Sequence, residues 1–175
     1  MASQPVSIIS ALQVPLLKTM ALTTPGGHPI VEVGVFNGGS AWYLAEAARI
    51  KGDELHLFDT FSGIPFHDPN DSNVTGEFPG SYESVLEAIP DAHFHVGIFP
   101  ETMPTDLKSV SFVHCDCDQY RSVRPVIDIF WPLLVPGGVM AFDDMFTAGG
   151  RRAILETFPD IGGEQGWWLV GKPSN

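Results

Sequence analysis

The sequence is short of positive charge, short of cysteine and without a long apolar run. Only 9 of its 175 residues are Lys or Arg, against 21 Asp or Glu, and the formal net charge is −12. Because nucleic-acid affinity comes largely from Lys and Arg beside phosphates, neither a nucleic acid nor an anionic membrane is expected as a partner. No apolar stretch approaches the roughly 20 residues of a transmembrane helix, and residues 1–5 lack the basic start of a signal peptide. We therefore expect a cytoplasmic protein.

The two cysteines, Cys115 and Cys117, are too few and too close for a structural zinc site. Their spacing is not that of a C-x-x-C redox motif, and two positions apart in a strand they share a face. We interpret them as small buried strand residues, with a redox or metal role as the less favoured alternative.

Residues 30–40, with the sequence IVEVGVFNGGS, form the most informative stretch. The β-branched apolar run predicts a buried parallel strand over residues 29–36, and the composition after Ser40 is helical up to about Ile50. Glycines are needed where a backbone approaches a ligand without a Cβ, and free N–H groups at a helix start attract polar or anionic groups. The stretch predicts a nucleotide-like ligand, although a turn that binds nothing remains the alternative.

The spacing of this turn, E-x-G-x-x-x-G-G, departs from the G-x-G-x-x-G of dinucleotide sites. Glu32, two residues before Gly34, suits a ligand that carries an ammonium group. S-adenosylmethionine has such an amino-acid tail and no pyrophosphate. The spacing therefore favours it over a nicotinamide dinucleotide.

The rest of the chain alternates between strand and helix patterns. Strands are expected over residues 54–60, 93–99, 109–118, 139–144 and 166–171, with helices over 81–89, 124–134 and 151–158. Residues 6–22 predict a helix kinked at Pro15, within an N-terminal segment, residues 1–28, that packs on the core. The pattern predicts one doubly wound α/β domain over residues 1–175, with a mostly parallel sheet and helices on both faces. The loop over residues 61–80 is long enough to be a lid or an acceptor-binding wall.

Acidic residues stand at the carboxyl ends of four expected strands, where α/β sheets bind their ligands. Asp59 lies 21 positions after Gly38, as expected for an acid that binds ribose hydroxyls, although it could instead cap a helix. Asp116, Asp143 and Asp144 offer an oxygen-rich site for Mg²⁺, and the alternative is that Asp143 and Asp144 cap the next segment. The full set at these ends is Glu32, Asp59, Asp116, Asp118, Asp143 and Asp144. His114, next to this set, is a second-choice base.

Five ordered blocks of the sequence resemble the macrocin O-methyltransferase family, and the resemblance runs from about residue 29 to 158. The blocks are VEVGVFNGGS (31–40), FDTFSGIP (58–65), GIFPET (97–102), DCDQY (116–120) and LVPGG (134–138) leading to Asp143 and Asp144. The resemblance implies a Rossmann-like class I methyltransferase with a seven-stranded type of sheet. It also implies S-adenosylmethionine as methyl donor and Mg²⁺-dependent transfer to a hydroxyl of a small molecule, often a sugar or another natural-product scaffold.

The resemblance also implies roles for individual residues. Those matched to the methionine part of the donor are Glu32, Gly34 and Ser40, with Gly38 in the same turn. Asp59 is matched to the ribose, and Thr60, Phe61 and Ile98 to the surroundings of the adenine. Asp116, Asp143 and Asp144 are matched to the metal, with Asp116 also at the cofactor and the first choice as general base.

Two other functions fit parts of this sequence. One is a non-catalytic S-adenosylmethionine-binding module, and the other, less favoured, is a nicotinamide-dependent oxidoreductase. A homodimer is also open, because Trp167, Trp168 and the apolar N-terminal helix would bury either against a second copy or on their own sheet.

Overall fold

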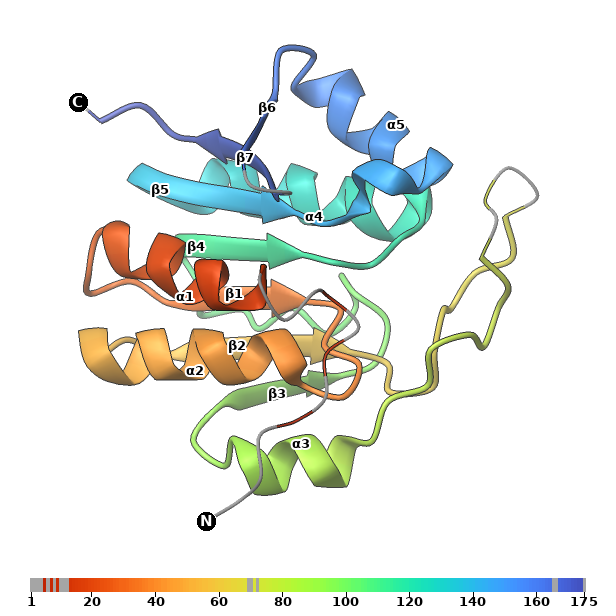
Figure 1. Ribbon diagram of the computed structural model, residues 1–175, viewed down its shortest axis with the longest axis horizontal. Helices are drawn as coiled ribbons and strands as arrows, with labels where there is room; N and C mark the ends of the chain where they lie inside the picture. Colours follow the sequence, from red (N-terminus) through yellow and green to blue (C-terminus); the bar gives the residue numbers. More distant parts are fainter. Residues whose placement is uncertain are drawn as a thin grey trace.

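The protein folds as a seven-stranded sheet with helices on both faces (Figure 1). The computed structural model describes residues 5, 7, 9, 13–68, 71, 73–164 and 167–174. The strands are β1 (Ile30–Val33), β2 (Leu55–Asp59), β3 (His93–Val96), β4 (Val110–Cys115), β5 (Leu134–Phe142), β6 (Gly162–Glu164) and β7 (Trp167–Gly171), in the spatial order β3-β2-β1-β4-β5-β7-β6. The strands β1 to β5 run parallel, β7 pairs antiparallel with β5, and β6 pairs antiparallel with β7. The predicted fold class is confirmed.

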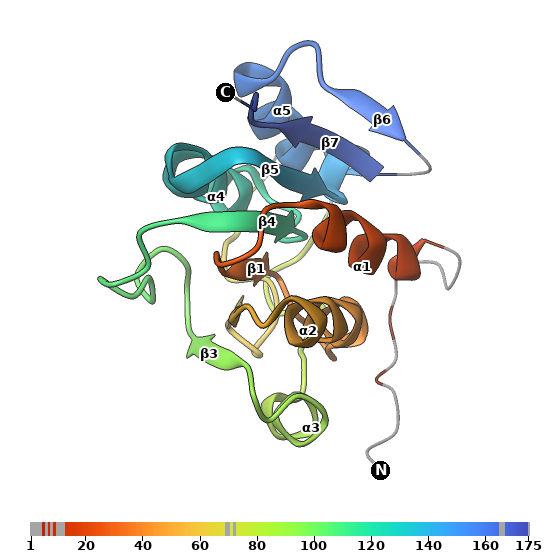
Figure 2. The ribbon, with the colours of Figure 1, turned by 90° about the vertical axis from the view of Figure 1, so that its left-hand side faces the viewer.

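The helices are α1 (Val14–Thr23), α2 (Gly39–Lys51), α3 (Tyr82–Ala88), α4 (Tyr120–Leu133) and α5 (Ala148–Thr157), with a 3₁₀ turn, η1 (Asp144–Phe146). Figure 2 shows α1 and α2 on one side of the sheet and α4 on the other. Every residue of β1 and β4 is buried, because both faces of these central strands are covered. The covered sheet thus places the carboxyl ends of five parallel strands along one edge.

Local sequence explains where several helices begin and end. The last turn of α2 carries Arg49 and Lys51, and Gly52 ends it in the left-handed conformation, at φ +71°. Ser81 is the N-cap of α3, since its hydroxyl accepts a hydrogen bond from the Ser84 N–H.

The prediction was wrong in details of four elements. The helix α1 begins only at Val14 and is not kinked at Pro15, which lies in its first turn where a missing N–H costs nothing. The helix α4 begins at Tyr120, four residues earlier than expected, and α5 includes Gly149 and Gly150 instead of following them. The strand β6 was not predicted, because two of its three residues are glycines. Parts of the predicted helix over residues 6–22, and Gly166 of the last predicted strand, lie outside the described residues.

Trp167 packs on its own sheet. It is 1% exposed, and its indole N–H donates to the Gln13 carbonyl oxygen at 3.3 Å. Trp168 is partly buried against the core on the other face. Over the described ranges, no helix has both the length and the apolar character needed to cross a membrane.

Candidate functional site

A cavity of about 250 Å³ opens at the carboxyl ends of the parallel strands. Its walls come from the glycine turn after β1, the end of β2, the loop over residues 61–80, the segment after β3 and the acidic segments after β4 and β5. The lining residues on which the argument rests are Gly34, Phe36, Ser40, Asp59, Thr60, Phe78, Ile98, Asp116, Asp118 and Asp143. This is the edge where open α/β sheets bind ligands.

The glycine turn between β1 and α2 is held against the end of β4. Gly34 has φ +91°, and a Cβ built on it would lie 1.7 Å from the Asp116 carbonyl oxygen, so this position tolerates only glycine. Gly38 has φ +81° and is the N-cap of α2, and Ser40 in the first turn lines the cavity. Of the residues predicted for the methionine part, Gly34 and Ser40 thus line the cavity, and Gly38 shapes the turn beside it.

Asp59 fixes this turn from the neighbouring strand. One carboxylate oxygen accepts the N–H groups of Val35 and Phe36, at 2.6 and 2.8 Å, and the other accepts the N–H of Phe61 at 2.7 Å. An ionised carboxylate has about four acceptor sites, so Asp59 keeps capacity for a ligand hydroxyl while it orders the turn. It also lines the cavity.

Glu32 lies within the sheet and not in the cavity wall. It is fully buried, and one of its carboxylate oxygens lies 2.7 Å from Nδ1 of His114 on the adjacent strand β4. The other oxygen of Glu32 and Nε2 of His114 have no hydrogen-bond partner among the described residues. The pair packs beside the ring of Trp167, whose centroid is 5.2 Å from that of His114.

Four acids gather after β4 and β5, and three of them, Asp116, Asp118 and Asp143, line the cavity. Asp144 lies behind them, where its carboxylate accepts the N–H groups of Cys117 and Asp118 at 3.0 and 2.9 Å. Burial raises the pKa of Asp116 well above its usual value, and the nearby carboxylates of Asp144, Asp143 and Asp118 raise it further. Burial also raises the pKa of Asp118, Asp143 and Asp144.

These acids offer oxygen ligands in excess of positive charge, which is the donor set that Mg²⁺ prefers. Asp116 and Asp143 line the cavity, whereas Asp144 does not, and each of its oxygens accepts one backbone N–H. In the described part of the chain, two sets of His, Cys, Asp or Glu bring their ligand atoms within 4.8 Å of one another. Neither is the predicted triad of Asp116, Asp143 and Asp144.

The cysteines lie beside these four acids, Asp116, Asp118, Asp143 and Asp144, which we call the acidic rim. Cys115 is buried in the core, Cys117 follows the strand, and their sulfur atoms are 3.6 Å apart. Burial raises the pKa of the Cys115 thiol. The pKa of the Cys117 thiol is raised by its hydrogen bond with Cys115 and by burial. A raised pKa favours the thiol over the reactive thiolate.

The backbone is strained around the cavity. Among the described residues, four other than glycine have φ between +52° and +63°, and they are Phe36, Phe61, Phe78 and Asp118. Three of them line the cavity, and Phe61 follows the lining residue Thr60. Positive φ is uncommon for such residues and gathers at functional sites, where the surrounding structure holds it in place.

The loop over residues 61–80 extends beyond the arrowheads of the strands (Figure 1). The side-chain amide of Gln119 binds both backbone groups of Phe66 in this loop. Its NH₂ donates to the Phe66 carbonyl oxygen at 2.8 Å, and its oxygen accepts the Phe66 N–H at 3.3 Å. Asp71 accepts the N–H of Gly149 at 2.6 Å, which ties the loop to α5. Gln119 and the lining residue Phe78 were not singled out in the sequence, where the length of this loop was the only signal.

The predicted surroundings of the adenine lie in two neighbouring segments. Thr60 and Ile98 line the cavity, and the Thr60 hydroxyl donates to the Gly63 carbonyl oxygen at 2.8 Å. Phe61 packs edge-on against Tyr82, with ring centroids 5.5 Å apart, and is not part of the wall.

Comparisons with known proteins give one consistent result. A family model described as "Methyltransferase domain" matches residues 31–145. A curated protein of Streptomyces olivaceus, 8-demethyl-8-(2,3-dimethoxy-alpha-L-rhamnosyl)-tetracenomycin-C 4'-O-methyltransferase, is 24% identical over 79% of this chain and 64% of its own length. The chain thus spans a little less than two thirds of the length of that relative.

Solved structures of similar fold include the O-methyltransferase NovP, with a TM-score of 0.78, 19% identity and coverage of 95% of this chain and 82% of that one. CalS11, a calicheamicin methyltransferase, gives a TM-score of 0.73, 20% identity and coverage of 91% and 77%. At these identities the two structures establish the likeness of fold.

Proposed function

Because the chain belongs to the family of methyltransferase domains, we propose that it transfers a methyl group from S-adenosylmethionine to a hydroxyl of a small molecule. The resemblance noted in the sequence is confirmed at the level of this family. The observation that carries the proposal is the single cavity wall that joins the glycine turn, Asp59 and the acidic rim at one sheet edge.

The donor fits the glycine end of the cavity. Its ribose hydroxyls match the remaining acceptor capacity of Asp59, and the adenine matches the segments that carry Thr60 and Ile98. Its amino-acid tail matches the turn from Gly34 to Ser40, because both of these residues line the cavity. Glu32 acts on this tail only through the fold, because its carboxylate is buried against His114.

The acidic end of the cavity suits the acceptor. In methyl transfer the acceptor oxygen forms a bond to the methyl carbon while the bond from that carbon to sulfur breaks, and the hydroxyl proton must pass to a base. Asp116 lies in the cavity wall between the glycine turn and the other acids, where its carboxylate can accept the proton of a bound hydroxyl. We therefore assign it the role of general base.

Asp116 and Asp143 would hold a divalent cation, with Asp144 ordering the loop beneath them. Such an ion, when bound, lowers the pKa of the acceptor hydroxyl and offsets the rim charges. Asp118, which also faces the cavity, adds a further negative charge to attract it.

The substrate class is proposed from the relatives. The curated relative is named for methylation of a rhamnosyl group on tetracenomycin, and the fold neighbours NovP and CalS11 are described as an O-methyltransferase and a calicheamicin methyltransferase. We propose a glycosylated natural product or its sugar as acceptor. The cytoplasmic location and a homodimer stay predictions.

The test is methyl transfer from donor labelled in its methyl group to a panel of deoxysugar-bearing scaffolds and free nucleotide sugars, with and without Mg²⁺. The proposal expects product that depends on Asp116 and on the metal. Donor binding without transfer to any acceptor, in the presence of Mg²⁺, would instead favour a non-catalytic binding module. Tight binding of a nicotinamide dinucleotide in place of the donor would contradict the proposal.

A further inference from the structure

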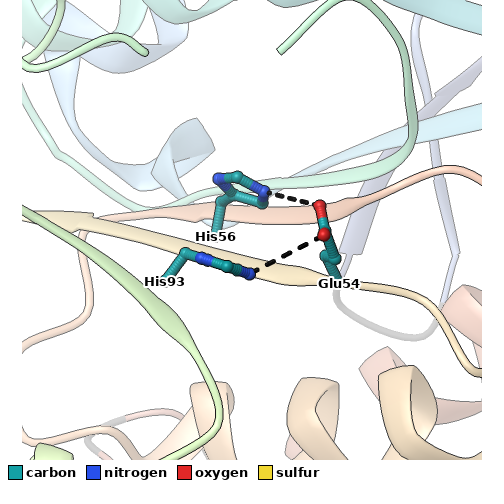
Figure 3. A group of neighbouring side chains, drawn as sticks. All are labelled: Glu54, His56 and His93. Carbon is teal, nitrogen blue, oxygen red and sulfur yellow. Dashed lines mark hydrogen bonds and ion pairs between the residues drawn. The ribbon is translucent and has the colours of Figure 1, made fainter. Parts of the chain in front are cut away.

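A second group of metal-ligating side chains lies at the opposite ends of the strands from the cavity. It consists of Glu54, just before β2, His56 on β2 and His93, the first residue of β3. Side chains two positions apart share a face of a strand, and His56 pairs in register with His93, so all three project from one face of the sheet. Figure 3 shows the two imidazole rings side by side, each with one nitrogen directed at the Glu54 carboxylate.

The distances suit an ion between these groups. Nε2 of His56 lies 3.5 Å from one carboxylate oxygen of Glu54, and Nε2 of His93 lies 3.9 Å from the other. One ligand atom from each residue lies within 4.8 Å of the other two. Zn²⁺ binds imidazole nitrogen and carboxylate oxygen at about 2.0–2.2 Å, so a small movement of the half-exposed Glu54 and His93 side chains completes such a site.

His95 orients His56 from behind. Nδ1 of His56 lies 2.9 Å from Nε2 of His95, so one hydrogen is shared between the two nitrogens. When His56 donates this hydrogen, its Nε2 carries a lone pair toward Glu54 and His93. A metal-binding histidine commonly donates its other ring N–H to an acceptor in this way, which fixes its tautomer and ring orientation.

We propose that Glu54, His56 and His93 bind a divalent transition metal ion, with Zn²⁺ as the probe, and that His95 is the positioning residue for His56. The two imidazole nitrogens are borderline ligands, which favour Zn²⁺ over Mg²⁺, and a carboxylate oxygen binds Zn²⁺ as well. The bound ion joins the edge strand β3 to β2, and three protein ligands leave a fourth position for water.

The site is independent of the proposed catalytic cavity. His93 is the first residue of β3, and the nearest cavity-lining residue along the chain, Gly97, follows four positions later. Four positions of extended strand span about 13 Å. The other group of ligand atoms within 4.8 Å among the described residues, formed by Cys115, Cys117 and Asp144, lies beside the cavity and is not part of this site.

The test is calorimetric titration of Zn²⁺ into the full chain after removal of metals by chelation, with excess Mg²⁺ present to occupy the acidic rim. The expected result is one Zn²⁺ site whose affinity falls at least tenfold in His93→Gln and in Glu54→Gln. Both side chains are more than half exposed, so these variants keep the fold. The matched control is His67→Gln, which removes an exposed histidine outside the group and should leave the site intact.

Two further measurements sharpen the result. With Co²⁺ in place of Zn²⁺, the spectrum should lack a thiolate charge-transfer band. Imidazole nitrogen resonances should show the His56 proton on Nδ1 when the metal is bound, and His95→Phe, which removes the acceptor, should weaken Zn²⁺ binding while His95→Gln restores much of it. Equal Zn²⁺ affinity in wild type, His93→Gln and Glu54→Gln, no Zn²⁺ binding by wild type, or a thiolate band would each overturn the proposal. Binding of S-adenosylhomocysteine to the His93→Gln variant reports separately on the cavity.

Discussion

Gly34 and Asp116 lie in backbone contact, such that a Cβ on Gly34 would stand 1.7 Å from the Asp116 carbonyl oxygen. The contact joins the end of β1 to the end of β4, and it places the glycine turn beside the acid assigned as base. The turn proposed to hold the donor and the residue proposed as general base are therefore positioned by one another.

Gly34→Ala should destabilise the protein strongly. The new methyl group meets backbone that cannot move independently of β4, and the residue is held at φ +91°, so we expect a loss of at least about 3 kcal/mol in the free energy of unfolding. Denaturant unfolding measures the change. Gly26→Ala is the matched control, because no atom lies within 4 Å of a Cβ there, and equal stability of the two variants would contradict the contact.

Glu32→Gln separates a structural role from a ligand role. Because Glu32 is buried and paired with His114, we expect a loss of about 2–4 kcal/mol in stability, while donor affinity of the folded protein changes little. Unfolding curves and calorimetry with S-adenosylhomocysteine give the two quantities. Unchanged stability with a tenfold weaker affinity would assign Glu32 to the amino-acid tail, as the sequence predicted.

Asp59→Asn should weaken binding of S-adenosylhomocysteine at least tenfold, which is about 1.4 kcal/mol. An amide offers one acceptor oxygen in place of two, so at least one N–H among Val35, Phe36 and Phe61 loses its partner and the turn loosens. Calorimetry measures the affinity. Asp160→Asn, at an exposed position, serves as control and should bind as wild type does, whereas normal binding by Asp59→Asn would remove Asp59 from the site.

The stability of the metal-free protein should depend on His95. Burial, with the charges of His56 and His93, lowers the pKa of His95 from 6.5 to about 4, and Asp106 opposes the shift only in part. The folded state therefore binds fewer protons than the unfolded state between these values, so this residue's contribution to stability falls as pH falls from about 6.5 to about 4. Burial lowers the pKa of His56 as well.

His95→Gln should make the free energy of unfolding depend less steeply on pH between about 6.5 and about 4. Urea unfolding at pH 7, 6 and 5 in the presence of a chelator compares the variant with wild type, and the difference isolates His95 from the rim acids. His28→Gln is the control, since it removes a histidine hydrogen-bonded to Ser109, away from this group. The same pH dependence of the free energy of unfolding in His95→Gln and wild type would contradict a lowered pKa of His95.

The sequence was sufficient to predict the parts that depend on local pattern. Apolar runs followed by glycines or acids gave β1, β2, β4 and β5 and the position of the glycine turn, because a buried parallel strand has a recognisable composition. The orientation of the Glu32 side chain was harder to infer, because it depends on which neighbouring strand supplies its hydrogen-bond partner. That partner, His114, is distant in sequence.

Loop contacts were beyond the sequence for a different reason. Phe78 lies in a loop whose sequence has no periodicity, so its position could not be predicted. Nothing in the local sequence indicates that the Gln119 amide binds the N–H and the carbonyl oxygen of Phe66. Asp144 stays a predicted metal ligand, and the sequence did not indicate that its carboxylate also accepts two backbone N–H groups of the neighbouring segment. Such non-local hydrogen bonds become visible only when β4 and β5 lie side by side.

The most direct test of the account is a crystal structure with S-adenosylhomocysteine and Mn²⁺, in which anomalous scattering locates the ion. The account predicts the nucleoside in the cavity between Asp59 and the Gly34 turn, and the ion at Asp116 and Asp143 beside the sulfur. A nucleoside bound elsewhere, or an ion that contacts neither Asp116 nor Asp143, would contradict it.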